Sequence, residues 1–227
     1  MNPHISEQFD AELDAARSQL MEMGGMVEKL LRDATEALVG QDAALAEKVK
    51  LADKRVNQLE VDIDEQCVNI IARRQPAASD LRTLISVMKA STDLERVGDE
   101  AGRIAKMAIS LADLDYPTDE FSDFRRIATL THEIMAGSLD AFARLDTDGA
   151  MRVIAADQAI DDAYDDLVRQ RSSKMREDPE SIEGDMCIIW AARALERIGD
   201  HAKNIGEYVV YLVRGQDLRG RGKHQLG

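Results

Sequence analysis

The sequence contains acidic residues in pairs set four positions apart, an arrangement suited to metal binding. Positions four apart on a helix differ by only about 40° around its axis, so both side chains of a pair project in one direction. Three pairs are fully acidic, and in a fourth pair an asparagine replaces the second acid. The pairs are Asp53 and Asn57, Glu95 and Asp99, Asp157 and Asp161, and Glu196 and Asp200.

These pairs indicate a bound cation. Two neighbouring carboxylates on a helix repel each other by roughly 0.2–0.5 kcal/mol when exposed. The repulsion is larger where the pair is partly buried and less screened by water. Carboxylate-only ligation favours hard cations such as Mg²⁺, Mn²⁺, Ca²⁺ or iron over a structural zinc site made from Cys and His. We therefore expect two pairs, one from each of two helices in a bundle, to surround one or more ions.

Other interpretations of the pairs stay open. The chain has 43 acidic residues, so a single acidic pair also arises by chance as a solvated helix face. A structural bundle without metal is one alternative, and a carboxylate-bridged di-metal enzyme, an oxidase or a phosphate hydrolase, is another. The ferritin-like form of such an enzyme uses Glu-x-x-His motifs, which this sequence lacks.

Residues beside the acidic pairs add to the candidate site. Arg96 and Arg197 could neutralise the acids next to them, either as structural ion pairs or as groups that orient the metal ligands. Gly98 and Gly199 each cost a helix up to about 1 kcal/mol, so we expect a close helix approach or access to the acids at these positions. His201 is an alternative ligand, although a place at the edge of the core explains it more simply.

No catalytic residue is predicted. The sequence contains no Ser-His-Asp or Cys-His arrangement, no glycine-rich phosphate loop and no HExxH motif, so nothing supplies a nucleophile. Cys67 and Cys187 lie in apolar helical patterns and are interpreted as small buried hydrophobic residues in a reducing compartment.

Composition and charge argue against several classes of partner and fold. With 43 acidic against 29 basic residues, the 227-residue chain has a formal net charge of −14, which argues against nucleic acid or anionic lipid as the main partner. Only 4 Phe, 4 Tyr, 1 Trp and 4 Pro are present, so the composition of an all-β fold is missing. No stretch approaches the roughly 18 apolar residues of a membrane span, so no direct membrane insertion is expected.

Apolar residues recur at steps of three and four, which predicts long amphipathic helices. Residues that break helices separate six such stretches, and Ser79 is a candidate N-cap for the third helix. The breaks lie at 40–42, 75–76, 113–119, 146–149 and 178–179, and the sixth helix is expected from about 181 to 214.

The chain contains an internal repeat. The segment LERVGD at 94–99 matches LERIGD at 195–200 with an offset of 101 residues, and Pro76 matches Pro179 with an offset of 103. Fixed register inside helices and drifting offsets in loops are typical of duplicated three-helix units. We therefore predict an all-α fold of two tandem three-helix bundles, at 1–114 and 120–215, with a linker at 115–119 and a flexible tail at 216–227.

Several motifs resemble one known family. HIS at 4–6, FD at 9–10, LMEMGGM at 20–26, LERVGDEAGRIAK at 94–106 and LERIGDHAKNIGEYVVYLVRG at 195–215 are similar to the PhoU family of phosphate-signalling regulators. The similarity spans almost the whole chain, including the repeat. It implies a six-helix, two-bundle, metal-binding and usually dimeric protein that is not an enzyme.

The resemblance also implies partners and a place in the cell. Proteins of this family act with the ATPase subunit of a phosphate-specific ABC transporter and with a membrane sensor histidine kinase. They keep the phosphate-starvation regulon off when phosphate is plentiful. A cytoplasmic homodimer, recruited to the inner face of the membrane through its partners, is therefore expected.

The family's metal motif, Glu/Asp-x-x-x-Asp, carries over to three of the four pairs and only in part to the fourth. Asn57 stands where the second repeat has Asp161, so the first-repeat site is expected to be weaker or to hold fewer ions. The cation implied is divalent or trivalent: iron, manganese, magnesium or zinc.

Overall fold

The computed structural model describes residues 3–114, 116–117 and 120–218. In this part of the chain every regular element is a helix, and there are six long ones, as predicted. They are α1 (Pro3–Gly40), α2 (Ala43–Arg74), α3 (Ala78–Ala112), α4 (Ser122–Arg144), α5 (Thr147–Glu177) and α6 (Ile182–Arg214), with a short 3₁₀ turn at Pro179–Ser181 before α6.

Local sequence chemistry sets the helix ends. Asp42 caps α2 by accepting a hydrogen bond from the backbone N–H of Leu45 at 2.9 Å, which satisfies one of the free amides at a helix start. Gln75 and Leu145 adopt left-handed backbone conformations just beyond α2 and α4, a common way of ending a helix. The predicted N-cap Ser79 is wrong, because α3 begins at Ala78 and its cap, Ala77, makes no side-chain hydrogen bond.

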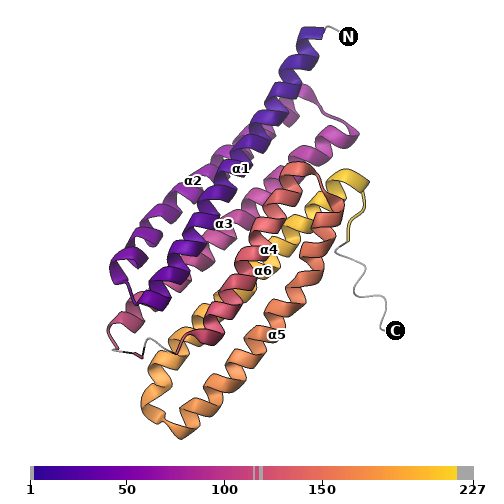
Figure 1. Ribbon diagram of the computed structural model, residues 1–227. Coiled ribbons are helices and arrows are strands. Elements are labelled where there is room, and N and C mark those ends of the chain that lie inside the picture. The colour runs from indigo at the N-terminus through magenta and orange to yellow at the C-terminus, as the bar shows by residue number, and fades with distance from the viewer. Residues whose placement is uncertain (1–2, 115, 118–119, 219–227) are drawn as a thin grey trace.

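The six helices form two three-helix units lying side by side (Figure 1). Helices α1, α2 and α3 pack on one another, as do α4, α5 and α6, while α3 packs against α6 and α1 against α4 between the units. One continuous hydrophobic cluster runs through both units. The predicted linker at 115–119 and tail at 216–227 fall partly outside the described residues.

Polar contacts join the two central helices. Asp93 on α3 is buried and is held by α6 through His201 Nδ1 at 2.7 Å, Asn204 Nδ2 at 3.1 Å and the Tyr208 hydroxyl at 2.7 Å. Because a buried carboxylate is costly unless it is hydrogen-bonded, these contacts fix the register of α3 against α6.

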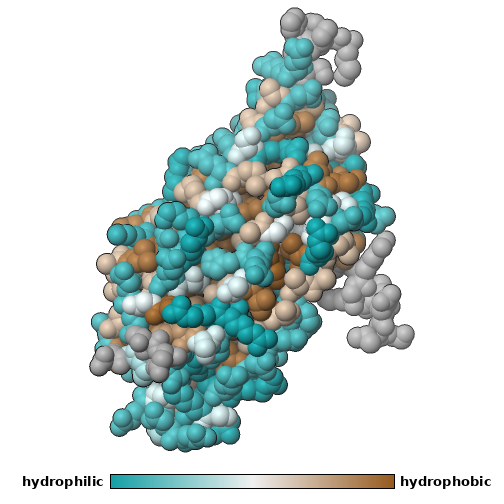
Figure 2. Space-filling model, in the orientation of Figure 1, coloured by the Kyte–Doolittle hydropathy of each residue, from teal (hydrophilic) through white to brown (hydrophobic). Residues whose placement is uncertain are grey.

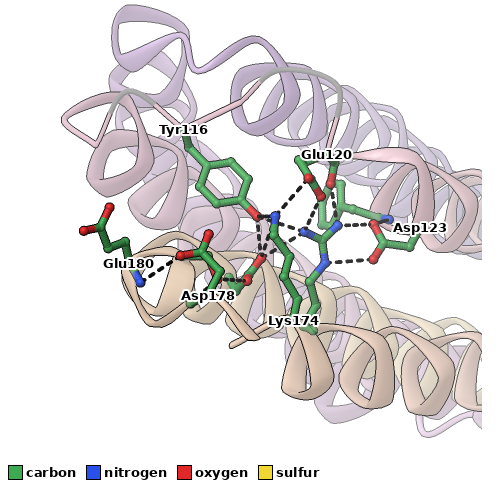
Figure 3. A network of polar contacts seen from close by, with 10 residues as sticks. Tyr116, Glu120, Asp123, Lys174, Asp178 and Glu180 are labelled. Atoms are coloured by element: carbon green, nitrogen blue, oxygen red, sulfur yellow. Dashed lines mark hydrogen bonds and ion pairs between the residues drawn. The ribbon is translucent and has the colours of Figure 1, made fainter. Parts of the chain in front are cut away.

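A second buried network holds the chain where it enters the second unit (Figure 3). Arg171 of α5 is 4% exposed and Asp185 of α6 is fully buried, and the Arg171 guanidinium lies 3.0 Å from the Asp185 carboxylate. The Tyr116 hydroxyl donates a hydrogen bond to Asp185 and accepts one from Arg171 at 2.9 Å. Asp123, near the start of α4, accepts two hydrogen bonds from Arg171.

The ionisation states in this network follow from its contacts. Burial and the hydrogen bond to Asp185 raise the pKa of Tyr116 to about 12, so its hydroxyl keeps its proton. Burial acts to raise the pKa of Asp185, but hydrogen bonds from Tyr116, Ser181 and Arg171 outweigh it and hold that pKa below its ordinary value. Asp185 therefore stays charged opposite a charged arginine.

The surface is mainly hydrophilic. Hydrophilic side chains cover most of the face drawn in Figure 2, with hydrophobic ones showing between them. Some large apolar side chains are exposed, among them Ile182, Met186 and Trp190 on α6. None of the described helices is long and apolar enough to cross a membrane. Both cysteines, Cys67 and Cys187, are buried and unbridged, as predicted.

Candidate metal centres

Each unit gathers one set of the predicted site residues between two of its helices. The first acidic cluster consists of Asp53 and Asn57 on α2 with Glu95 and Asp99 on α3. The second acidic cluster consists of Asp157 and Asp161 on α5 with Glu196 and Asp200 on α6. The two motif repeats thus place equivalent clusters in both units.

The motif glycines make room for the acids. A Cβ added at Gly98 would lie 2.6 Å from Asp53 Oδ1, and a Cβ added at Gly199 would lie 3.3 Å from Asp157 Oδ1 and 2.9 Å from the side chain of Ile160. The neighbouring helix therefore presents its carboxylate directly over the backbone of each glycine. This confirms the expectation of a close helix approach and explains why residues of poor helix propensity are used at these positions.

The acids of the first cluster act on one another. Burial and the charge of Asp99 raise the pKa of Asp53 above its ordinary value. Burial, then Asp99, raises the pKa of Glu95, with Arg96 opposing the shift and Glu60 and Asp53 adding to it. These raised pKa values show that too little positive charge or hydrogen bonding surrounds the ionised carboxylates of the first cluster.

Carboxyl pKa values are raised in the second cluster as well. Burial and the charges of Asp157 and Asp200 raise the pKa of Asp161, with Lys203 opposing the shift. Burial also raises the pKa of Glu196, where Arg193 opposes it and the three aspartates of the cluster add to it. Both clusters are therefore sites where added positive charge is favourable.

The donor atoms fit a hard cation. Asp53 Oδ1, Asn57 Oδ1 and Glu196 Oε2 are buried oxygens without a hydrogen-bond partner in the described part of the chain, and such atoms normally find one. Carboxylate and amide oxygens are the ligands that Mg²⁺, Mn²⁺, Ca²⁺ and iron prefer. No three His, Cys, Asp or Glu side chains among the described residues could hold an ion as they stand, so binding would require the carboxylates to turn toward a shared point.

Two residues distinguish the clusters and were missed from the sequence. Glu60 on α2 acts on Glu95 and accepts a hydrogen bond from the Thr92 hydroxyl at 3.3 Å, so the first cluster has a further acid nearby. Lys203 on α6 places its ammonium 2.6 Å from Asp157. Comparison of the repeats at the 101-residue offset could have revealed the lysine, because Gly102 stands at the equivalent position.

The remaining predicted neighbours divide between two roles. Arg96 lies 3.5 Å from Glu95 and 3.8 Å from Asp99, in contact with the first cluster. Arg197 differs, because it pairs with Glu100 of α3 at 3.1 Å and so bridges the two units. His201 is engaged by Asp93, which agrees with its interpretation as a residue at the edge of the core.

The glycine geometry gives a testable prediction. Gly98→Ala gains helix propensity but forces Asp53 aside, so we expect it to be about 1–3 kcal/mol less stable than Gly102→Ala. Gly102 is the matched control, because it lies one turn later on α3 and a Cβ there meets nothing within 4 Å. That control should gain up to about 1 kcal/mol. Urea unfolding measures both; equal stability of the two variants would contradict the close approach.

The family model described as "PhoU domain" matches the chain twice, at 20–108 and 124–209. The chain belongs to the PhoU family. Each match contains one of the two acidic clusters, so the PhoU domain is the repeated unit that carries them.

Relatives with curated names agree. A "Phosphate-specific transport system accessory protein PhoU homolog" from Pseudomonas putida is 50% identical over 98% of this chain and 87% of its own length. The accessory protein PhoU of Escherichia coli K12 is 43% identical over the whole chain and 93% of its own length. These names describe accessory proteins of a transport system and not enzymes, so they give no support to the di-metal enzyme alternative.

Solved structures confirm the fold. The crystal structure of PhoU from Pseudomonas aeruginosa has a TM-score of 0.89 at 48% identity, covering 92% of this chain and all of that one. The phosphate transport system regulatory protein PhoU from Streptococcus pneumoniae has a TM-score of 0.86 at 30% identity, with coverage of 92% and 99%. The all-α, duplicated PhoU fold predicted from the sequence is therefore confirmed.

Proposed function

We propose that the protein is a non-enzymatic, metal-binding regulator of phosphate uptake and phosphate signalling. The names of its relatives support the link to a phosphate-specific transport system. The observation that carries the metal-binding part is the recurrence, in both units, of partly buried carboxylates with raised pKa values and unpartnered oxygens.

In this proposal each acidic cluster holds one or more divalent or trivalent cations. Asp53, Glu95 and Asp99 supply carboxylates in the first cluster and Asn57 supplies an amide oxygen. Asp157, Asp161, Glu196 and Asp200 supply four carboxylates in the second, where Lys203 already neutralises one charge. When bound, such an ion supplies the positive charge that these acids lack, and it ties together the two helices of a cluster.

The adaptor role rests on shape and charge. Two joined helical units present long exposed helix faces, and the surplus of acidic residues suits basic patches on partner proteins. We propose that the partners are the ATPase subunit of a phosphate ABC transporter and the sensor histidine kinase of the phosphate two-component system. The protein would act in the cytoplasm as a homodimer and repress the phosphate-starvation regulon when phosphate is plentiful.

A binding experiment tests the adaptor role. Immobilised protein should retain the purified ATPase subunit and the cytoplasmic domain of the kinase at physiological salt, with affinity falling as salt increases because complementary charges are screened. An acidic protein of similar size and charge serves as the control for non-specific retention. Absence of binding to both partners would overturn the adaptor role while leaving the metal sites to be tested separately.

A further inference from the structure

The groove between α1 and α4 contains a different set of functional groups. It has a volume of about 470 Å³, and its polar lining comes from Arg32, Thr35 and Glu36 on α1 and from Arg125, Thr129 and His132 on α4. We call it the α1/α4 groove. It shares no residue with either acidic cluster, and it spans the boundary between the two units, where α1 packs against α4 (Figure 1).

Two arginines in this groove have no acidic partner. Arg32 and Arg125 are exposed, and neither makes an ion pair or a side-chain hydrogen bond within the described residues. Other arginines of this acidic chain do pair, such as Arg193 with Glu196 at 2.6 Å. Among the described residues, Glu36 is the one acidic side chain lining the groove, so the two arginines leave it with a net positive charge.

A histidine and a threonine that contact each other also line the groove. His132 Nε2 lies 3.2 Å from Thr35 Oγ1, and that hydroxyl donates to the backbone carbonyl of Arg32 at 2.9 Å. The Thr35 oxygen is thus an acceptor for an Nε2–H of His132. Burial and the neighbouring charge of Arg32 lower the pKa of His132, with Glu36 opposing the shift, so an anion placed beside these groups would favour protonation.

The two arginines lie on opposite sides of the Thr35–His132 pair along the groove. The end of α1 lies beside the start of the second unit, since Gln41 Nε2 donates to the Tyr116 carbonyl at 2.6 Å, so α1 and α4 run in opposite directions (Figure 1). Arg32 lies three residues before Thr35 and Arg125 seven before His132. At 1.5 Å of rise per residue, the arginine backbones are separated by about 15 Å along the groove, so the two side chains approach the Thr35–His132 pair from opposite ends.

We propose that the α1/α4 groove binds a nucleoside di- or triphosphate or a similar small ligand with linked phosphate groups. Guanidinium groups bind phosphate oxygens through paired, charge-assisted hydrogen bonds, and arginines toward both ends suit a chain of phosphates. Between the two arginines, Glu36 can accept a hydrogen bond from a ligand hydroxyl, and Val39 and Ala128 add apolar surface. The volume lies in the range of ordinary small-molecule sites.

Isothermal titration calorimetry tests this site on the full-length protein. ATP is titrated in magnesium-free buffer with EDTA, so that metal ions at the acidic clusters cannot hold the phosphates. We expect one ATP per chain, and Arg32→Gln and Arg125→Gln should each weaken binding about tenfold or more. Arg126→Gln is the matched control, because Arg126 is an exposed neighbour on α4 that does not line the groove; it should bind as the parent does.

Further arms separate the ligand classes. Tripolyphosphate should bind more weakly than ATP but more tightly than orthophosphate, and ATP binding should tighten as pH falls and His132 becomes protonated. No ATP binding, or an equal loss in Arg126→Gln, would overturn the proposal. Preferential binding of orthophosphate would overturn the linked-phosphate assignment. The proposal does not depend on the adaptor role, because failure of the partner-binding experiment leaves these titrations unchanged.

Discussion

Asp185→Ala is expected to lower the free energy of unfolding by about 3–5 kcal/mol, because it removes the fully buried counter-ion of Arg171 and leaves Asp123 as the close partner of the buried guanidinium. Arg171 is 4% exposed and Asp185 is fully buried. The Tyr116 hydroxyl also loses its acceptor at the same point. Urea unfolding at neutral pH, followed by circular dichroism, measures the loss.

Two further variants identify the cause of that loss. Glu183→Ala, an exposed acid two residues earlier on α6, should change stability by no more than about 0.5 kcal/mol. Adding Arg171→Met to Asp185→Ala should cost less than Arg171→Met costs in the parent, because the ion pair between residues 171 and 185 is already broken. A loss below about 1 kcal/mol in Asp185→Ala, or strictly additive losses in the double variant, would contradict the role given to this network.

Glu196→Gln with Asp200→Asn is expected to abolish metal uptake at the second acidic cluster while the first cluster keeps its ions. Amides retain the shape of the side chains but remove two of the four carboxylate charges that the proposed ion requires. Inductively coupled plasma mass spectrometry on protein purified without chelator measures the bound metal. Glu177→Gln with Glu183→Gln, two exposed acids in the same unit, makes the same change in charge and should retain all metal.

The same variant should alter how stability depends on pH in the metal-free protein. Since folding raises the pKa of Glu196 and of Asp161, the stabilising effect of protonation is complete below the ordinary values of 4.5 and 3.8. It is lost as pH rises through the raised values. In the metal-free parent these two carboxyls therefore add stability as pH falls toward those values, while His132, whose pKa folding lowers, acts in the opposite sense.

Glu196→Gln with Asp200→Asn should show a weaker gain, because residue 196 no longer titrates and one charge acting on Asp161 is gone. Thermal unfolding between pH 7 and pH 5 gives the comparison. An unchanged pH dependence together with undiminished metal content would remove the second cluster from the proposed function.

The fold was largely predictable because its signals are local. Apolar spacing marks helix faces, and residues such as Asp42, Pro76 and Pro179 interrupt helices wherever they occur. The repeated motif also placed equivalent acids in both units. Ser79 was predicted incorrectly as a cap, since the backbone starts the helix one residue earlier without using a side-chain acceptor.

The contacts that could not be predicted join residues far apart in the sequence. No sequence motif links the three residues of the buried network, Tyr116, Arg171 and Asp185. They meet because the segment before α4 passes the end of α5 and the start of α6. Likewise, Lys203 on α6 donates a hydrogen bond to Asp157 on the neighbouring helix α5. In each case the sequence supplies a charged residue, and only the packing of helices determines which opposite charge it meets.

The exposed tryptophan of α6, Trp190, gives the protein an intrinsic fluorescence signal. Trp190 is the single tryptophan and is 60% exposed in the folded protein, so its emission already has the character of a solvated ring before denaturant is added. Fluorescence intensity and wavelength should therefore respond weakly to unfolding. The same signal is left free to report events that cover or restrict the outer face of α6, with no label introduced.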